Sequence, residues 1–216
     1  MKIHNILLYL PALLLLMTGF TSCSENVDDD NEFANWQKVN DEYFDNIYTS
    51  AMSSQLLGDH SWQVFRTWSK EESAATHSYD HVVVNVLQSG SGSGCPLYSD
   101  SVMVHYTGRL LPSPSYPDGY IFDQSYYGDY NPDISTPAKF LVSGLVDGFT
   151  TALQYMHIGD RWRIYIPYQL AYGTMSSGSI PACSTLVFDV TLVAYCRAGS
   201  SFPPFKSKKR SQWVFE

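Results

Sequence analysis

The chain has 216 residues, of which 44% are apolar and 15% aromatic, and its 13 Lys and Arg stand against 21 Asp and Glu, a formal net charge of −8. This length has room for one domain with additional segments. Charged residues make up only 16% of the chain, which argues against a helical bundle or coiled coil; together with the many Tyr, Gly and Pro residues it favours a sheet-rich fold. The acidic balance argues against a nucleic-acid-binding protein, and the apolar content excludes a disordered chain.

The first 22 residues have the pattern of a signal peptide. Lys2 precedes a nearly continuous apolar run from Ile6 to Phe20. At about fifteen residues, this run is shorter than the roughly 20 that span a membrane. It ends in small residues and Cys23, a pattern that resembles the lipobox of bacterial lipoproteins. The resemblance implies that Cys23 becomes the lipidated first residue of an exported bacterial lipoprotein, anchored at the outer membrane on the periplasmic face or at the cell surface. Simple secretion, with Cys23 an ordinary thiol, is the alternative.

Residues 23–31 are acidic and are expected to form a solvated tether. Beyond Cys23, three cysteines remain: Cys95, Cys183 and Cys196. This odd number permits at most one disulfide, and none of the three has the spacing of a metal site. We therefore assign them no function and expect neither a metal nor another cofactor.

Residues 32–75 are predicted to form an N-terminal helical extension and a short strand. Apolar residues recur every three or four positions in 32–51, which indicates an amphipathic helix with Asp30 or Asn31 as its cap. This helix either docks on its own domain or serves as a homodimerisation arm. Apolar residues alternate in 62–68, which favours an edge strand.

From His81 onward the pattern changes to that of β-strands. Strands are predicted over four runs rich in β-branched residues: 81–87, 101–108, 160–167 and 185–195. In the last two runs apolar side chains alternate with polar ones, so we expect one buried face and one solvent-exposed face. In 160–167 the exposed face is predicted to carry Arg161, Arg163 and Tyr165.

One helical pattern interrupts the strands. The apolar residues of 146–159 share one face, at Phe149, Leu153 and Met156. Gly159 suits the turn that ends such a helix. One short helix among antiparallel strands indicates a sheet curled around it. The final segment, 197–216, carries a basic run at 206–210 and is expected to be a solvated tail without nucleic-acid contact.

Eight short strings in residues 80–195 resemble those of the FK506-binding-protein (FKBP) family of peptidyl-prolyl cis-trans isomerases. They occur in the family's order with near-family spacing: VHYTG (104–108), DG (118–119), FDQS (122–125), GLVDGF (144–149), MHIGDRWRIYIP (156–167), AYG (171–173), IP (180–181) and TLVFDVTL (185–192). Each string alone is a weak signal, but the ordered set is specific. The resemblance implies an α+β fold over residues 76–196, in which a five- to six-stranded antiparallel β-sheet wraps around one short α-helix.

The resemblance also implies an activity. FKBP-type isomerases accelerate the isomerisation of X-Pro bonds in an aromatic pocket between helix and sheet, without a cofactor. Tyr106, Phe122 and Phe188 match the aromatic walls of that pocket, and Phe149 matches its floor. Taken singly, each ring would be read as ordinary core, and only the shared pattern favours a pocket. The expected partners are proline-containing polypeptides of exported client proteins and FK506-like macrolides.

Five further residues match other groups of the family's pocket. Leu145 and Val146 match the pair before the helix, where Val146 offers a backbone N–H to a ligand carbonyl. Tyr172 matches the tyrosine whose hydroxyl donates to the peptide carbonyl, Asp123 matches the pocket carboxylate, and Ile180 matches an apolar residue of the rim. Such a site needs no nucleophile, because the amide is twisted by desolvation and hydrogen bonding.

The sequence departs from the family pattern in the pocket walls. Ala138 stands where most relatives have an aromatic, two residues before Phe140, so one wall is missing or filled from elsewhere. The loop at 174–179 is shorter than in relatives, and an insert occupies 112–117. These changes bear on substrate preference and macrolide affinity more than on the fold.

A fourth departure concerns the carboxylate. The arginine that pairs it in relatives is absent from residues 124–133. Asp123 therefore either has another partner, such as Tyr126 or Tyr130, or is freer.

Other functions remain open. A noncatalytic peptide-binding or chaperone module on the same fold is the main alternative. A nutrient-binding surface lipoprotein would stack sugars on exposed aromatics such as Trp62, Trp68 and the Tyr-rich 116–130 loop. A hydrolase is disfavoured because no G-x-S-x-G string occurs. The 32–51 helix lies outside the matched strings, so we expect its removal to leave the pocket chemistry intact.

Overall fold

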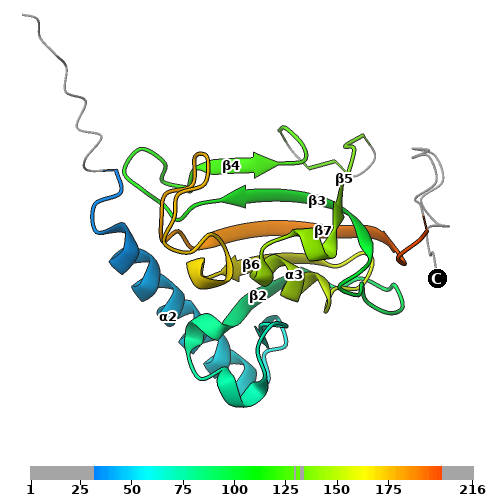
Figure 1. The fold of residues 1–216 in the computed structure, drawn as a ribbon, viewed down its shortest axis with the longest axis horizontal. Coiled ribbons are helices and arrows are strands. Elements are labelled where there is room, and N and C mark those ends of the chain that lie inside the picture. Colours follow the sequence, from blue (N-terminus) through cyan, green and yellow to red (C-terminus); the bar gives the residue numbers. More distant parts are fainter. Residues whose placement is uncertain (1–31, 129, 132–133, 201–216) are drawn as a thin grey trace, which may run out of the picture. The chain divides into compact units, whose positions relative to one another are not determined.

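The computed structural model describes residues 32–200 apart from 129, 132 and 133. The signal peptide, Cys23, the acidic tether, the expected caps Asp30 and Asn31, and most of the C-terminal tail lie outside the described residues. Within these residues, no helix is long and apolar enough to cross a membrane. The chain from Glu32 onward clusters into one compact unit, in which two helices pack on an antiparallel sheet (Figure 1).

The described residues build a seven-stranded sheet in the order β1-β2-β6-β7-β3-β4, with β5 paired to β3. The strands are β1 (Trp62–Arg66), β2 (His81–Gln88), β3 (Ser101–Arg109), β4 (Ile121–Gln124), β5 (Ala138–Leu141), β6 (Arg161–Ile166) and β7 (Leu186–Cys196). Every pairing is antiparallel, which confirms the α+β fold class. All five predicted strands occur. Six of the seven strands, β2 to β7, lie within residues 76–196, in agreement with the predicted five to six, and β1 is the short strand predicted for the N-terminal extension. Strands β4 and β5 were not predicted individually, because 4 residues each are too few for alternation to be recognised.

Helix α3 (Asp147–Leu153) lies on one face of the sheet, over β2 and β6 (Figure 1). A Cβ on Gly148 would lie 2.3 Å from Cγ2 of Ile166, so only glycine lets the helix approach β6 this closely. The helix is shorter than the predicted 146–159, and the prediction that Gly159 ends it is wrong. Gly159, at φ 93°, instead lies in the turn that leads into β6.

Helix α2 (Trp36–Leu56) covers the opposite face of the sheet. In β2 the three consecutive valines 82–84 are all 0% exposed, although successive strand residues point to opposite faces. Both faces are therefore covered at this point. Tyr43 of α2 places its ring 6.3 Å from that of Tyr165 in β6, and Tyr165 is 7% exposed. The predicted solvent-exposed face of β6 is wrong at this position, because α2 packs on it.

Helix α2 begins at Trp36, after Asn35 in a left-handed conformation, and not at residue 32 as predicted. The carboxylate of Glu32 instead accepts hydrogen bonds from the Ser113 hydroxyl and the Ser115 N–H of the 112–117 insert. The apolar face of α2 docks on its own domain, which is one of the two alternatives; a part in homodimerisation stays a prediction.

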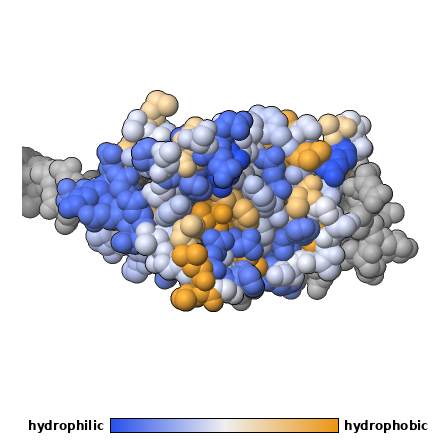
Figure 2. Space-filling view, turned by 90° about the horizontal axis from the view of Figure 1, so that it is seen from below, coloured by the Kyte–Doolittle hydropathy of each residue, from blue (hydrophilic) through white to orange (hydrophobic). Residues whose placement is uncertain are grey.

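Seen from below, the described surface is largely hydrophilic, with apolar side chains gathered near its middle (Figure 2).

Candidate active site

All nine residues predicted for the pocket line one cavity of about 580 Å³. The cavity lies between α3, the sheet and the loop that leads into β7. The nine residues are Tyr106, Phe122, Asp123, Leu145, Val146, Phe149, Tyr172, Ile180 and Phe188. Six lining residues were not assigned from the sequence: Phe140, Gly144, Ser177, Gly178, Ser179 and Leu186.

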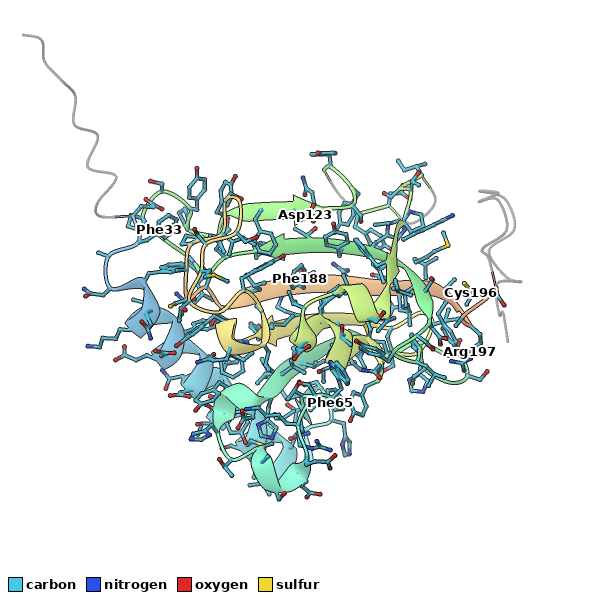
Figure 3. The ribbon with its side chains drawn as sticks, viewed as in Figure 1. Phe33, Phe65, Asp123, Phe188, Cys196 and Arg197 are labelled. Carbon is cyan, nitrogen blue, oxygen red and sulfur yellow. The ribbon has the colours of Figure 1, made fainter. Side chains whose placement is uncertain are left out.

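Three aromatic rings lie around that of Phe188, which is near the middle of the sheet (Figure 3). Phe149 of α3 has its ring centroid 4.8 Å from that of Phe188, and Phe122 of β4 meets Phe188 edge to face at 5.5 Å. The ring of Tyr106 lies 6.3 Å from Phe188. Phe149 and Phe188 are 4% and 9% exposed, so they form a nearly water-free apolar floor.

Gly108 makes room for two of these rings. A Cβ at this position would lie 2.6 Å from Cε1 of Phe188 and 2.7 Å from Cε2 of Phe122. Any other residue would therefore displace the pocket walls. Gly108 belongs to the HYTG string, but sequence reasoning gave it no role. A glycine inside an otherwise apolar strand was the available signal.

Asp123 has a partner that the sequence analysis did not name. The Tyr106 hydroxyl donates to Oδ2 of Asp123 at 2.7 Å, and the Gln124 N–H donates to Oδ1 at 2.9 Å. The suggestion of Tyr126 or Tyr130 as the partner is thus replaced by Tyr106. Burial, together with the hydrogen bond and the charge of Asp123, raises the pKa of the Tyr106 phenol well above its ordinary value. Tyr106 therefore remains a neutral donor at physiological pH.

Tyr126 and Tyr130 pack elsewhere. Their rings lie 6.3 and 5.2 Å from that of His105, which alternates with Tyr106 on β3 and so faces the other side of the sheet. Both rings thus pack beside His105, which points to the face of the sheet opposite to Tyr106.

Ala138 left two alternatives for its wall, missing or filled from elsewhere, and Phe140 of the same strand lines the cavity. Ala138 pairs with Val104 and is not among the lining residues, whereas Phe140 lines the cavity with its ring 5.6 Å from that of Tyr106. Across the cavity, Tyr172 is 41% exposed and Ile180 is 6% exposed. The pocket thus has an open tyrosine on one rim and a buried apolar side chain beside it.

Helix α2 supports this second wall from behind. Oδ1 of Asn40 accepts a hydrogen bond from the Thr185 N–H at 2.7 Å, and the Trp36 indole N–H donates to Oγ of Ser184 at 2.8 Å. Asn40 and Thr185 are both 0% exposed. Residues 184 and 185 directly precede Leu186, which lines the cavity. These contacts join α2 to the segment that leads into the pocket, and the expectation that removal of this helix leaves the pocket chemistry intact stays a prediction.

Comparison with known proteins decides the family. Residues 95–193 match the family of FKBP-type peptidyl-prolyl cis-trans isomerases. A Trypanosoma cruzi protein named macrophage infectivity potentiator is 36% identical over 149 residues, which cover 67% of this chain and 70% of that protein. The chain belongs to the FKBP-type peptidyl-prolyl cis-trans isomerase family.

Two further comparisons agree with this FKBP assignment. Outer membrane protein MIP of Legionella longbeachae is 36% identical over 114 residues, 52% of this chain and 43% of that protein. A crystal structure of a peptidyl-prolyl cis-trans isomerase from Pseudomonas syringae shares 26% identity and a TM-score of 0.51, over 74% of this chain and 95% of that one. The chain spans between 36% and 52% of the length of several other curated FKBP-type and Mip relatives.

The FKBP pocket of this chain offers aromatic faces, a few hydroxyls and one carboxylate. Among residues 32–200, as far as they are described, no three His, Cys, Asp or Glu side chains form a group that could hold a metal ion. The three described cysteines are free thiols, at Cys95, Cys183 and Cys196. The groups present suit binding and distortion of an amide better than attack on it.

Proposed function

We propose that this pocket catalyses cis–trans isomerisation of X-Pro bonds in exported client polypeptides, by removing water from the amide and binding its twisted form. The observation that supports this most is the enclosure itself. Four aromatic rings surround a cavity of about 580 Å³ whose polar groups include one carboxylate and a half-open tyrosine. A proline ring and its preceding amide are the kind of apolar, uncharged group that such a cavity accepts.

The barrier to be lowered is the amide resonance of the C–N bond. It amounts to about 18–20 kcal/mol, and uncatalysed X-Pro isomerisation takes tens to hundreds of seconds. Water stabilises the planar, resonant amide by donating to its carbonyl oxygen. A pocket that excludes this water and fits the twisted amide better than either planar form lowers the barrier. A preference of about 4 kcal/mol corresponds to roughly a thousandfold in rate.

Separate groups hold the ring and the backbone in this mechanism. Phe149, Phe188 and Phe122 pack around the proline ring. The Val146 N–H, at the N-cap of α3, and the Tyr172 hydroxyl donate to peptide carbonyls on either side. These hydrogen bonds fix the flanking backbone while the prolyl bond rotates.

The Tyr106–Asp123 pair holds a charge at the pocket wall. Because Tyr106 stays protonated, its hydrogen bond fixes the carboxylate in one orientation. Asp123 is exposed to solvent on β4, so this charge lies at the solvent-facing edge of the cavity and acts from there on the amide dipole, which changes as the bond twists. We assign Asp123 this electrostatic part and Tyr106 the positioning of it.

The test is an isomerisation assay on proline tetrapeptides, combined with aggregation of an unfolded protein. An isomerase speeds cis–trans exchange in tetrapeptides at substoichiometric concentration, and an FK506-like macrolide that occupies the pocket inhibits it. A noncatalytic chaperone suppresses aggregation but leaves the tetrapeptide rate unchanged. That second pattern would overturn the catalytic proposal.

We further propose that the protein is an exported lipoprotein, held at the outer membrane by lipid on Cys23. The support is the short apolar run from Ile6 to Phe20, which is followed by small residues and Cys23. In the bacterial host, a Cys23→Ala variant is expected to move from the membrane fraction to the soluble exported fraction. Retention of this variant in the membrane would contradict lipid anchoring.

A further inference from the structure

An exposed apolar surface lies beside α3, outside the pocket. We call it the Trp68 surface; it comprises Trp68, Leu97, Tyr98, Leu141 and Tyr155, which are 42%, 55%, 42%, 51% and 45% exposed. These residues come from the segment after β1, the loop before β3, the end of β5 and the turn after α3. Four separate segments thus leave large apolar side chains partly open to solvent around one helix.

The rings of this surface are held in place by the fold. The Trp68 ring lies against that of Tyr98 with a centroid distance of 4.4 Å, and the backbone N–H of Trp68 donates to Oγ1 of Thr151 in α3 at 3.2 Å. Tyr155 stacks on Phe65 at 4.2 Å, with an angle of 12° between the rings. Rigid aromatic faces lose little conformational entropy when a partner covers them. The aromatic side chains of the Trp68 surface are therefore preorganised for binding.

The Trp68 surface lies close to the pocket, because Trp68 contacts Thr151, which is one helical turn after Asp147 at the start of α3. The Ser69 hydroxyl donates to Oδ2 of Asp147 at 2.9 Å, and Asp147 directly follows Val146 of the pocket. On the other side, Leu141 leads through residues 142–144 to Leu145 of the pocket. An extended chain advances about 3.3 Å per residue, so three or four residues from the bound proline span roughly 10–13 Å. A client held in the pocket can thus reach the Trp68 surface.

We propose that the Trp68 surface is a second binding site for the client, which takes apolar side chains a few residues from the isomerised proline. This inference rests on the proposed isomerase function and names the class of substrate: unfolded segments with an apolar residue near an X-Pro bond. The closeness of this surface to the pocket along α3 favours a polypeptide as the occupant, because one extended chain can contact both. Sugar stacking has less support, because Trp62, its other candidate tryptophan, is stacked on Tyr165 at 6.2 Å.

The experiment compares two peptide lengths on the full mature chain. One substrate is a proline tetrapeptide; the other is a ten-residue peptide with Leu or Ser placed four residues from the proline. The wild-type protein is expected to show kcat/KM about tenfold higher for the long Leu peptide than for the long Ser peptide. In a Trp68→Ala/Tyr98→Ala variant this ratio falls close to one. The matched control is Tyr116→Ala. Tyr116 is 44% exposed, its ring centroid lies 5.0 Å from that of Tyr120, and it is not among the residues that line the pocket.

The outcomes separate this inference from the proposed function. If the wild type isomerises none of the peptides, the proposed function fails. If it isomerises the tetrapeptide but does not distinguish Leu from Ser, the second site is refuted without any variant. A Leu preference that survives in Trp68→Ala/Tyr98→Ala, or is lost equally in Tyr116→Ala, also refutes it. Quenching of tryptophan fluorescence by oligosaccharides and not by the Leu peptide would assign the surface to sugar instead.

Discussion

Replacing Asn40 with alanine tests whether α2 supports the pocket. Asn40 is fully buried in α2, and its side chain makes two hydrogen bonds of 2.7 Å, one from the Thr185 N–H and one to the Trp36 carbonyl. The substitution leaves a buried N–H without an acceptor, at the residue just before the lining residue Leu186.

The expected cost follows from these contacts. An unsatisfied buried donor destabilises by about 1–3 kcal/mol, and the space left by the amide adds to this. We expect a loss of about 2–4 kcal/mol in the free energy of unfolding, which lowers Tm by roughly 6–12 °C in a domain of this size. The segment before Leu186 loses the hydrogen bond that holds it to α2. We therefore expect KM for proline peptides to rise several-fold, while kcat changes less.

The assay combines urea unfolding with peptide isomerisation well below Tm. Lys38→Ala is the matched control on the same helix, since the Lys38 side chain is 74% exposed; it should change the free energy of unfolding by less than about 0.5 kcal/mol. A destabilised Asn40→Ala protein with wild-type KM would show that α2 stabilises the domain without shaping the pocket. An equally stable Asn40→Ala protein would refute the reasoning altogether.

Two further predictions concern the pocket walls. Gly108→Ala should lower both stability, by about 1–3 kcal/mol, and peptide turnover, because the new Cβ collides with Phe122 and Phe188. Gly144→Ala, whose Cβ meets no atom within 4 Å, is the control for the stability measurement. Tyr106→Phe should alter the response to alkaline pH measured by urea unfolding. The folded-state pKa of Tyr106 lies above its ordinary value of 10, so its contribution to stability is complete below pH 10 and is lost as pH rises further. The wild type should therefore lose more stability than Tyr106→Phe above pH 10, and parallel pH curves would contradict this.

Sequence reasoning succeeded where pattern and spacing carry the information. The alternation in β7 identified its buried face, and the ordered strings placed nine residues that all line one cavity. Both features can be recognised in the sequence alone, because strand period and motif order are local properties of the chain. Strands of 4 residues, such as β4 and β5, are too short to show a period.

The contacts that were missed join residues far apart in sequence. Tyr106 and Asp123 were each assigned to the pocket, but their hydrogen bond depends on the pairing of β3 with β4. Asn40 and Thr185 are separated by 145 positions, so nothing local marks Asn40 as a support of the pocket. The same docking of α2 buries Tyr165, whose strand pattern alone indicates exposure.

The central claim is that isomerisation takes place in this aromatic cavity. Its most direct test is kcat/KM for a proline tetrapeptide, measured for Phe149→Leu, Tyr172→Phe and Asp123→Asn in proteins whose circular dichroism and Tm show an intact fold. Phe149→Leu keeps most of the apolar volume and should reduce turnover. Tyr172→Phe removes one hydrogen bond, so it should raise mainly KM, by the equivalent of about 0.5–1.5 kcal/mol. Wild-type kcat/KM in all three folded variants would contradict the claim and assign these side chains to the core alone.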